Sequence, residues 1–327
     1  MTGHPQGAAL LGFGGFRPER SVTNEEVCER VDSSDEWIRT RTGITARGWA
    51  GPEETLETMA VSAAKGALQD AGEDPTTLDM VLVATCTNGQ SLQPLAPRVA
   101  TAVGSDCGAL DINATCAGFC YGLGLARDLV SGGTARQVLV VGAERLSDVT
   151  DPTDRGTAFI FADGAGAALV GRSFEEKIGP VVWGSDGARG ETLRLVPEWT
   201  QHAADPGLGR PAIRMEGRRV FKWAAEEMPR VALAACKAAG VDLGDIDVLV
   251  PHQANQRITD IIAEGLDLAP GVVVADDIAT TGNTSSASIP LAIHRMRCQG
   301  RLRGGERALL IGFGGGLSFA AQVVVLP

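Results

Sequence analysis

Cys116 is the side chain of this 327-residue sequence best placed for nucleophilic chemistry. It follows an expected strand and begins an expected helix that runs to about Val130. The helix dipole and unpaired backbone N–H groups there favour thiolate over thiol, and the small Ala117 and Gly118 would let a substrate come near. The alternative is a small buried residue that only fills the core, which we expect of Cys120 one turn later.

His252 follows directly on an apolar strand expected over residues 246–250. A histidine at the end of a strand is well placed to face a crevice, where it could donate or accept a proton. A purely structural hydrogen bond is the alternative. The contexts of the other histidines indicate surface positions for His4, His202 and His294.

Asn283 and a glycine run near the C-terminus complete the candidate groups. Asn283 lies in a Gly-Asn turn before a small-residue helix. Its side-chain amide either contacts a substrate or caps the N-terminus of that helix. The run Gly312–Gly316 follows a strand and exposes backbone N–H donors. These donors suit an oxyanion hole, and a strained turn is the alternative.

An internal repeat supplies the elements that position these groups. Four features recur in one order, displaced by about half the chain: Ala71-Gly72 with Ala239-Gly240, Met80–Val83 with Ile246–Val250, Asp111-Ile112 with Asp277-Ile278, and Val138–Gly142 with Ala308–Gly312. Alternating helices and apolar strands predict mixed or parallel sheets covered by helices. We therefore expect two similar α/β halves, residues 1–172 with the cysteine and residues 173–327 with the histidine and asparagine. Their strand-end loops would face a shared crevice.

Composition excludes several classes of function. The chain is 44% hydrophobic and carries a formal net charge of −11, so it lacks the basic surface of a nucleic-acid-binding protein. It has neither an apolar run of the ~18 residues that a membrane span needs nor a signal-like N-terminus, which predicts a cytoplasmic protein. Seven cysteines without a CxxC pair, and only four histidines, indicate neither a disulfide framework nor a metal site.

The motifs together resemble one family, β-ketoacyl-acyl-carrier-protein synthase III. The resemblance covers nearly the whole chain, in the family's order. It is carried by Ser34–Ile44, Thr115–Phe119, Asp151–Thr157, Pro251–Asn255, Gly282–Ser285 and Gly312–Gly316. It implies a duplicated thiolase fold, with two similar halves layered α-β-α-β-α. It also implies a condensing enzyme that initiates fatty-acid or polyketide chains.

The matched positions carry implied roles. The catalytic residues would be Cys116, His252 and Asn283, and the oxyanion hole would be the N–H groups of Cys116 and Gly315. The other implied groups are CoA binding by Trp37, Arg41 and Arg155, an acyl pocket with Leu146, Phe161 and Phe313, and carrier-protein docking by Lys222 and Arg257. For most of these positions a packed or solvated surface role is the alternative.

Acyl-CoA would acylate Cys116, and malonyl-acyl carrier protein would then lose CO₂ to give an enolate that attacks the thioester. Two hydrogen-bond donors suit an enolate better than a carboxylate does, which explains a histidine paired with an amide. The resemblance implies a homodimer, with CoA thioesters as substrates and no cofactor. Transfer of the acyl group to an alcohol or amine, or a non-catalytic partner subunit, are the alternatives.

Three positions depart from the family's usual pattern: Thr115, Arg218 and Gln93. Gln93 ends the loop that begins at Asn88, where many members carry a phenylalanine that reaches across the dimer. The shape of the acyl pocket, and so the starter unit, therefore stays open, and specialised polyketide metabolism is one setting for this chain.

Overall fold

The computed structural model describes residues 7–89 and 92–327, and it contains two five-stranded sheets of matching topology. The first sheet has the order β1 (Gly7–Phe16), β7 (Asp163–Ser173), β6 (Gln137–Arg145), β4 (Met80–Ala84) and β5 (Gly108–Ile112). The second has β8 (Val182–Ser185), β14 (Ser318–Val325), β13 (Arg307–Gly314), β11 (Val248–Pro251) and β12 (Val273–Val274). In both sheets the last three strands run parallel and the first two pair antiparallel, so the predicted duplication extends to strand direction.

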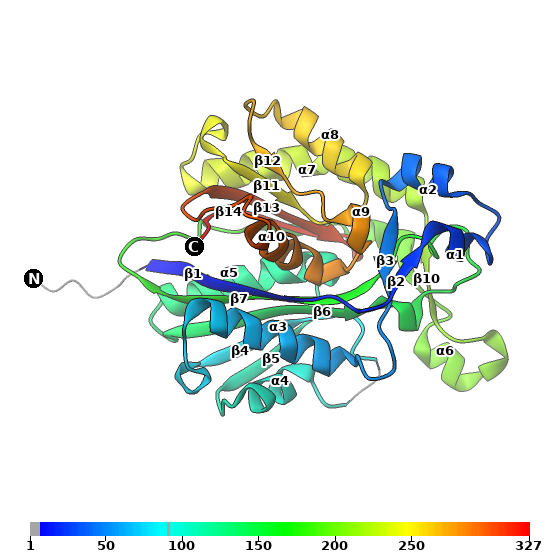
Figure 1. Cartoon of the computed structure of the whole chain (residues 1–327), viewed down its shortest axis with the longest axis horizontal. Helices are drawn as coiled ribbons and strands as arrows, with labels where there is room; N and C mark the ends of the chain where they lie inside the picture. Colours follow the sequence, from blue (N-terminus) through cyan, green and yellow to red (C-terminus); the bar gives the residue numbers. More distant parts are fainter. Residues whose placement is uncertain (1–6, 90–91) are drawn as a thin grey trace, which may run out of the picture.

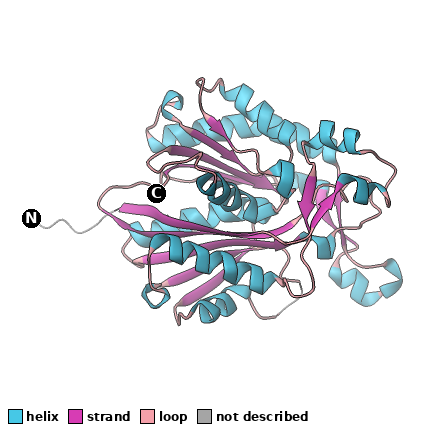
Figure 2. Ribbon diagram, in the orientation of Figure 1, coloured by secondary structure: helices cyan, strands magenta, loops and turns pink. Residues whose placement is uncertain are grey.

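Helices cover both faces of each sheet and make five layers (Figures 1 and 2). The outer face of the first sheet packs on α3 (Leu56–Ala71) and α4 (Leu95–Val103), and that of the second on α7 (Gly217–Ala239) and α8 (Gln256–Leu266). The two central helices, α5 (Gly118–Ser131) and α10 (Ser288–Cys298), fill the space between the sheets. The inner strands β4, β6, β11 and β13 are buried along most of their length, and their sequences are correspondingly apolar.

The repeated Ala-Gly pairs end helices, as the sequence predicts. Gly72 caps α3 with φ +68° and Gly240 caps α7 with φ +65°, a left-handed conformation that costs glycine little. The pair Asp277-Ile278 differs from its match: Asp277 precedes the short helix α9 (Ile278–Thr281), whereas Asp111-Ile112 ends β5. The counterpart of β5 in the second half, β12, has only two residues and ends before that point.

The central helices begin with equivalent turns. A 3₁₀ turn, η2 (Thr115–Ala117), leads into α5, and another, η7 (Ser285–Ala287), leads into α10. The first residue of each turn is a non-glycine with positive φ, +45° for Thr115 and +49° for Ser285. The two turns contact each other at the junction of the halves. Ser286 in the second half therefore occupies the position equivalent to that of Cys116 in the first half.

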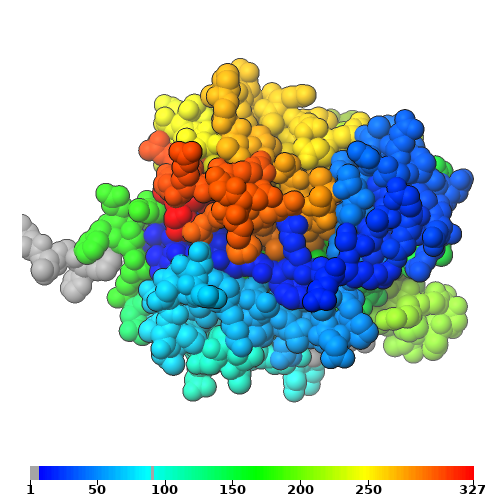
Figure 3. Space-filling view, in the orientation of Figure 1, coloured from blue at the N-terminus to red at the C-terminus, as the bar shows by residue number. Residues whose placement is uncertain are grey.

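Shorter elements gather at one end of the molecule, at the right of Figure 1. From the first half these are β2 (Ser21–Thr23), α1 (Asn24–Cys28), α2 (Asp35–Thr42) and β3 (Ala46–Gly48); from the second half they are β9 (Leu193–Val196), α6 (Trp199–Ala204) and β10 (Ala212–Met215). The space-filling view shows the two halves stacked, with the α6 region projecting at the lower right (Figure 3). Within the described ranges, none of the helices is both long and apolar enough to cross a membrane.

Candidate active site

Cys116 lies in the tight turn η2, at the start of central helix α5. Only 8% of the residue is exposed. The preceding Thr115 fixes the turn, since its hydroxyl donates to the carbonyl of Gly315 at 2.8 Å. The sulfur is therefore held where the two halves meet.

The protonation state of Cys116 differs from the sequence expectation of a thiolate. Burial raises the pKa of the Cys116 thiol to about 12, and the charge of Glu144 acts in the same direction. Hydrogen bonds from the Ser285 hydroxyl and from the backbone N–H groups of Cys116 and Gly315 lower the pKa, but by less. The helix end thus directs donors at the sulfur, while desolvation keeps it a thiol.

The glycine run after β13 lies directly against the nucleophile. A Cβ placed on Gly314 would lie 2.7 Å from the Cβ of Cys116 and 2.8 Å from its sulfur, so only glycine fits there. The N–H of the next residue, Gly315, points at the sulfur together with the N–H of Cys116. Two backbone donors converging on one atom are the arrangement that stabilises an oxyanion.

His252 follows β11, and its backbone N–H donates to the carbonyl of Ile311 at 2.7 Å. The imidazole is buried and packs edge-to-face on Phe313 at 5.3 Å. Nδ1 lies 2.7 Å from the Ser288 hydroxyl, so Nε2 is the ring nitrogen left for a substrate. Burial lowers the pKa of His252 to about 3, which keeps the ring neutral.

Asn283 is held by both its backbone and its side chain. Its N–H donates to Ile160 and its carbonyl accepts from Ala162, each at 2.9 Å, so that it bridges to Phe161 like a strand residue. Its side-chain oxygen accepts from the N–H of Ser285 at 2.8 Å. The amide nitrogen is therefore the end left free to donate to a substrate.

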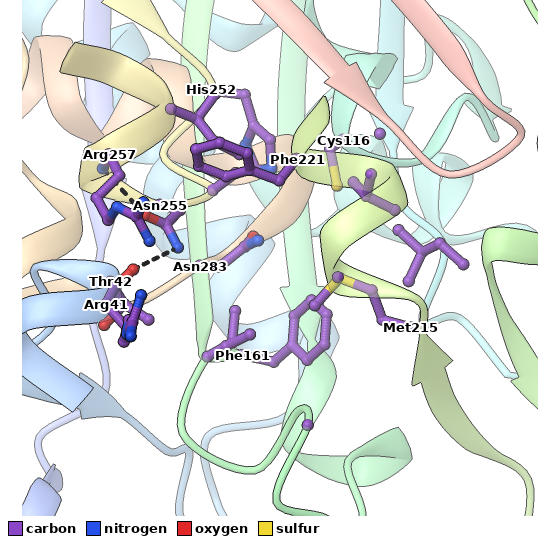
Figure 4. Close-up of a pocket in the computed structure, with 18 of the residues that line it drawn as sticks. Arg41, Thr42, Cys116, Phe161, Met215, Phe221, His252, Asn255, Arg257 and Asn283 are labelled. Carbon is purple, nitrogen blue, oxygen red and sulfur yellow. Dashed lines mark hydrogen bonds between the residues drawn. The ribbon is translucent and has the colours of Figure 1, made fainter. Parts of the chain in front are cut away.

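One cavity of about 700 Å³ brings these three side chains together (Figure 4). Cys116, His252 and Asn283 all line it, although they come from opposite halves of the chain. Trp37 and Arg41, from α2, line the same cavity, and the carbonyl of Arg41 accepts from Asn255 at 3.1 Å. Cys116 and two of the three residues assigned to CoA thus line one cavity.

Arg155 lies beside that cavity rather than among the residues that line it. Its guanidinium stacks over the Trp37 ring at 5.6 Å, and the ring meets Phe159 edge-on at 5.5 Å. The family resemblance implies that these two side chains sandwich the adenine of CoA, and the guanidinium would have to move away from the Trp37 ring to admit it.

Cys116 also lines a second cavity, of about 230 Å³. Its lining is largely apolar and includes two of the residues assigned to an acyl pocket, Leu146 and Phe161. Phe313 does not line it. It lines the first cavity instead, where it packs on His252, so its assignment to an acyl pocket stays a prediction.

Comparisons with known proteins identify the family of this chain. The family model described as 3-oxoacyl-[acyl-carrier-protein (ACP)] synthase III matches residues 110–187, and the model for the C-terminal part of that family matches residues 236–326. The β-ketoacyl-[acyl-carrier-protein] synthase III of Mycobacteroides abscessus is 50% identical over 321 residues, covering 97% of this chain and 94% of that protein. The chain belongs to the synthase III family. Synthase III 1 of Streptomyces coelicolor is likewise 50% identical, over 98% of this chain and 96% of that protein.

Solved structures of synthase III relatives share the fold. The priming β-ketosynthase from the R1128 polyketide pathway is 47% identical, with a TM-score of 0.97 over 100% of this chain and 98% of that one. The synthase III of Aquifex aeolicus is 38% identical, with a TM-score of 0.89 over 98% and 100%. The predicted duplicated thiolase fold is confirmed. As a synthase III family member, the chain is an acyltransferase and a condensing enzyme that initiates fatty-acid or polyketide chains.

The residues assigned to carrier-protein docking lie on α7 and α8, which pack together. Arg257 lines the first cavity and its guanidinium lies 5.1 Å over the Phe221 ring. Lys222 is exposed, 3.8 Å from Glu226. Another basic residue earlier in the chain, Arg214, pairs with Asp151 and Asp154 (2.8 and 3.1 Å).

Two of the three positions that depart from the family pattern lie at the site. Thr115 anchors the nucleophile turn, and Arg218 lines the first cavity. Gln93 belongs to a loop of which residues 90 and 91 lie outside the described residues. In the same loop, Asn88 donates to the carbonyl of Gln93 at 3.2 Å.

Sequence reasoning missed the groups that hold the catalytic side chains. Ser288 contacts His252, the N–H of Ser285 contacts Asn283, and Glu144 accepts from the Ser285 hydroxyl at 3.0 Å. The signal for Glu144 was a carboxyl at the end of an apolar strand that belongs to the repeat.

Proposed function

We propose that this chain transfers an acyl group from acyl-CoA to Cys116 and condenses it with a malonyl group carried by acyl carrier protein. The observation that carries the proposal is the position of Cys116 between two cavities, with His252 and Asn283 lining the larger one. The larger cavity suits the CoA or carrier arm, and the apolar cavity suits the acyl chain.

In the first half-reaction the sulfur of Cys116 attacks the thioester carbonyl and CoA leaves as its thiolate. The N–H groups of Cys116 and Gly315, which face the sulfur, would donate to the oxyanion that forms on the carbon bonded to that sulfur. Removing one donor of this kind from an enzyme typically costs about 10²–10³ in rate.

In the second half-reaction the malonyl thioester loses CO₂, and negative charge develops on its carbonyl oxygen. The Nε2 group of His252 and the amide nitrogen of Asn283 are the available donors. A neutral imidazole suits this role, because it donates a hydrogen bond without being consumed as an acid. The carbanion then attacks the acyl group on Cys116 and releases the 3-ketoacyl product.

The remaining expectations belong to the same proposal: a homodimer in the cytoplasm that needs no cofactor, because decarboxylation itself supplies the carbanion. Transfer to an alcohol or amine is less well supported. The Nδ1 of His252 contacts a serine hydroxyl rather than a carboxylate that would strengthen the ring as a base.

Two measurements on the purified protein test the proposal. Intact-mass spectrometry with a panel of acyl-CoAs should give one acyl adduct, mapped by peptide analysis to Cys116. Adding malonyl-acyl carrier protein should then discharge the adduct with equimolar CO₂ and a 3-ketoacyl product. An adduct that is discharged only by alcohols or amines, without CO₂, would contradict it.

A further inference from the structure

Gln253 carries a buried amide next to His252 in the chain, and no step of the proposed reaction uses it. Its Nε2 donates to the carbonyl of Pro251 at 2.8 Å, and its Oε1 accepts from the N–H of Ile278 at 3.0 Å. Both hydrogen bonds are buried. These two partners need a donor and an acceptor on one side chain, which an amide provides.

The amide of Gln253 takes the place of a missing backbone donor. β12 runs parallel to β11, and the last backbone bond between the two segments is donated by the N–H of Ala275 to the carbonyl of Leu249 at 3.0 Å. The next acceptor along β11, two residues later, is the carbonyl of Pro251. The chain turns into α9 before it reaches this carbonyl, and the Gln253 side chain donates to it instead.

The other end of the amide holds the start of α9, the helix that leads to Asn283. Ile278 is the first residue of α9, and its carbonyl accepts from the N–H of Gly282 at 3.0 Å. Gly282 directly precedes Asn283. Because α9 is a single turn closed by this bond, the position of Ile278 largely determines where Asn283 lies.

The backbone of Gln253 holds the far end of the same segment. Its N–H donates to the Ser288 hydroxyl at 3.2 Å, and that hydroxyl also contacts Nδ1 of His252. Ile278 lies five residues before Asn283, and Ser288 lies five residues after it. Gln253 is therefore bonded to both ends of the segment that has Asn283 at its centre.

The ion pairs at the start of α9 connect it to other elements. The carboxylate of Asp277 pairs with Arg295 of α10 at 2.9 Å and with Arg17, which follows β1. Neither of these contacts reaches β11, the strand that leads to His252. The Gln253 amide does reach it, through the carbonyl of Pro251.

We propose that Gln253 is a positioning residue, which fixes the amide of Asn283 relative to the imidazole of His252. The two groups are the proposed donors to one enolate oxygen, so their relative placement decides how well the developing charge is stabilised. Gln253 lines neither of the two cavities and acts through these two side chains. This inference rests on the proposed donor roles of His252 and Asn283.

Gln253→Met tests the proposal, because it keeps the length of the side chain and removes both amide hydrogen bonds. The kcat for condensation, followed by CO₂ release, should fall by about 10²-fold, since a displacement of about 1 Å can cost that much. The KM for malonyl-acyl carrier protein should stay unchanged. Acylation of Cys116 by acyl-CoA should keep its wild-type rate, whereas a merely structural role would lower both half-reactions together.

Gln322→Met is the matched control. Gln322 is a fully buried glutamine on β14, and within the described ranges neither polar atom of its side chain has a hydrogen-bond partner. The control makes the same chemical change at a buried site away from the two donors. It should leave both half-reactions unchanged.

A double-mutant cycle shows whether Gln253 acts through Asn283. In an Asn283→Ala background one donor is already absent, so Gln253→Met should reduce condensation by no more than about threefold. Fully additive losses, equal losses of acylation and condensation, or unchanged condensation in Gln253→Met would each overturn the proposal. Should Gln253→Met not fold, Gln253→Glu keeps the acceptor for Ile278, loses the donor to Pro251 and should show the same separation of the half-reactions. A wild-type enzyme that releases no CO₂ would instead contradict the proposed function.

Discussion

The Nδ1 atom of His252 and the hydroxyl of Ser288 lie 2.7 Å apart, buried beneath the larger cavity. The same serine oxygen accepts from the N–H of Gln253 at 3.2 Å. The serine proton is then free to be donated to Nδ1, which places the imidazole proton on Nε2. One hydroxyl thus sets the tautomer that a developing enolate requires.

Replacing His252 with alanine should separate the two half-reactions. Condensation should fall by about 10²–10³, because one of two donors to the enolate is lost. Acylation of Cys116 should persist, since the oxyanion donors are backbone N–H groups. Stopped-flow CO₂ release and intact-mass spectrometry measure the two steps. Ser288→Ala should reduce condensation by a smaller factor, and an equal loss of acylation in either variant would contradict this division of roles.

Asn283→Asp tests whether the amide acts as a donor. The side-chain oxygen that accepts from Ser285 is retained, but the NH₂ group becomes a second carboxylate oxygen. Negative charge facing the enolate should reduce condensation at least as much as Asn283→Ala, by 10² or more, and most strongly above the pKa of the new carboxyl. Condensation rates from pH 5 to 8 check this, and a variant as active as wild type would rule out the donor role.

The buried His252 should make the fold less stable in acid. Its folded-state pKa of about 3 lies below the ordinary value of 6.5, so the unfolded chain binds the proton first as the pH falls. The stabilising contribution is complete above pH 6.5 and is lost as the pH falls toward 3, at up to about 1.4 kcal/mol per pH unit. Urea unfolding at pH 7 and 4.5 measures it. His252→Gln should lose less stability over this interval, and an identical loss would contradict the assignment.

The smaller cavity should select the acyl chain. Leu195→Phe adds bulk to its apolar wall, so kcat/KM for branched or longer acyl-CoAs should fall by about 10–200-fold relative to acetyl-CoA. Phe221→Leu, in the larger cavity, is the control and should affect all acyl-CoAs alike. Loss of acetyl-CoA activity to the same extent in Leu195→Phe would show that the chain binds elsewhere.

Lys222 should act on the carrier protein and not on CoA. Because the side chain is exposed, Lys222→Glu should raise KM for malonyl-acyl carrier protein several-fold at low salt and weaken its salt dependence. Acylation by acyl-CoA should stay unchanged. Lys237→Glu carries the same charge change at the far end of α7 and serves as the control. Equal effects from the two variants would indicate a net-charge effect without docking at Lys222.

The sequence predicts more of the fold than of the site's electrostatics. The repeat gives both halves, because helices ending in Ala-Gly and buried apolar strands leave local patterns in each. Cys116 and His252 stand out because each follows a strand, and Asn283 stands out because it lies in a Gly-Asn turn before a small-residue helix. Glu144 and Ser285 are 141 positions apart and gain their roles only when the halves pack together, which no local pattern reveals. For the same reason a helix terminus predicts a thiolate at Cys116, whereas the packed structure buries a thiol.

The turns at Thr115 and Ser285 have matching backbones, but they make the two halves of the duplicated fold chemically different. In the first half the residue after the left-handed position is Cys116, whose thiol lines two cavities. In the second half it is Ser286, whose hydroxyl contacts Glu144 and a main-chain carbonyl. Because the two turns differ at this pair of equivalent positions, only the turn that contains Cys116 can be acylated. The acyl chain is therefore attached at one place, and the malonyl group approaches it from one direction.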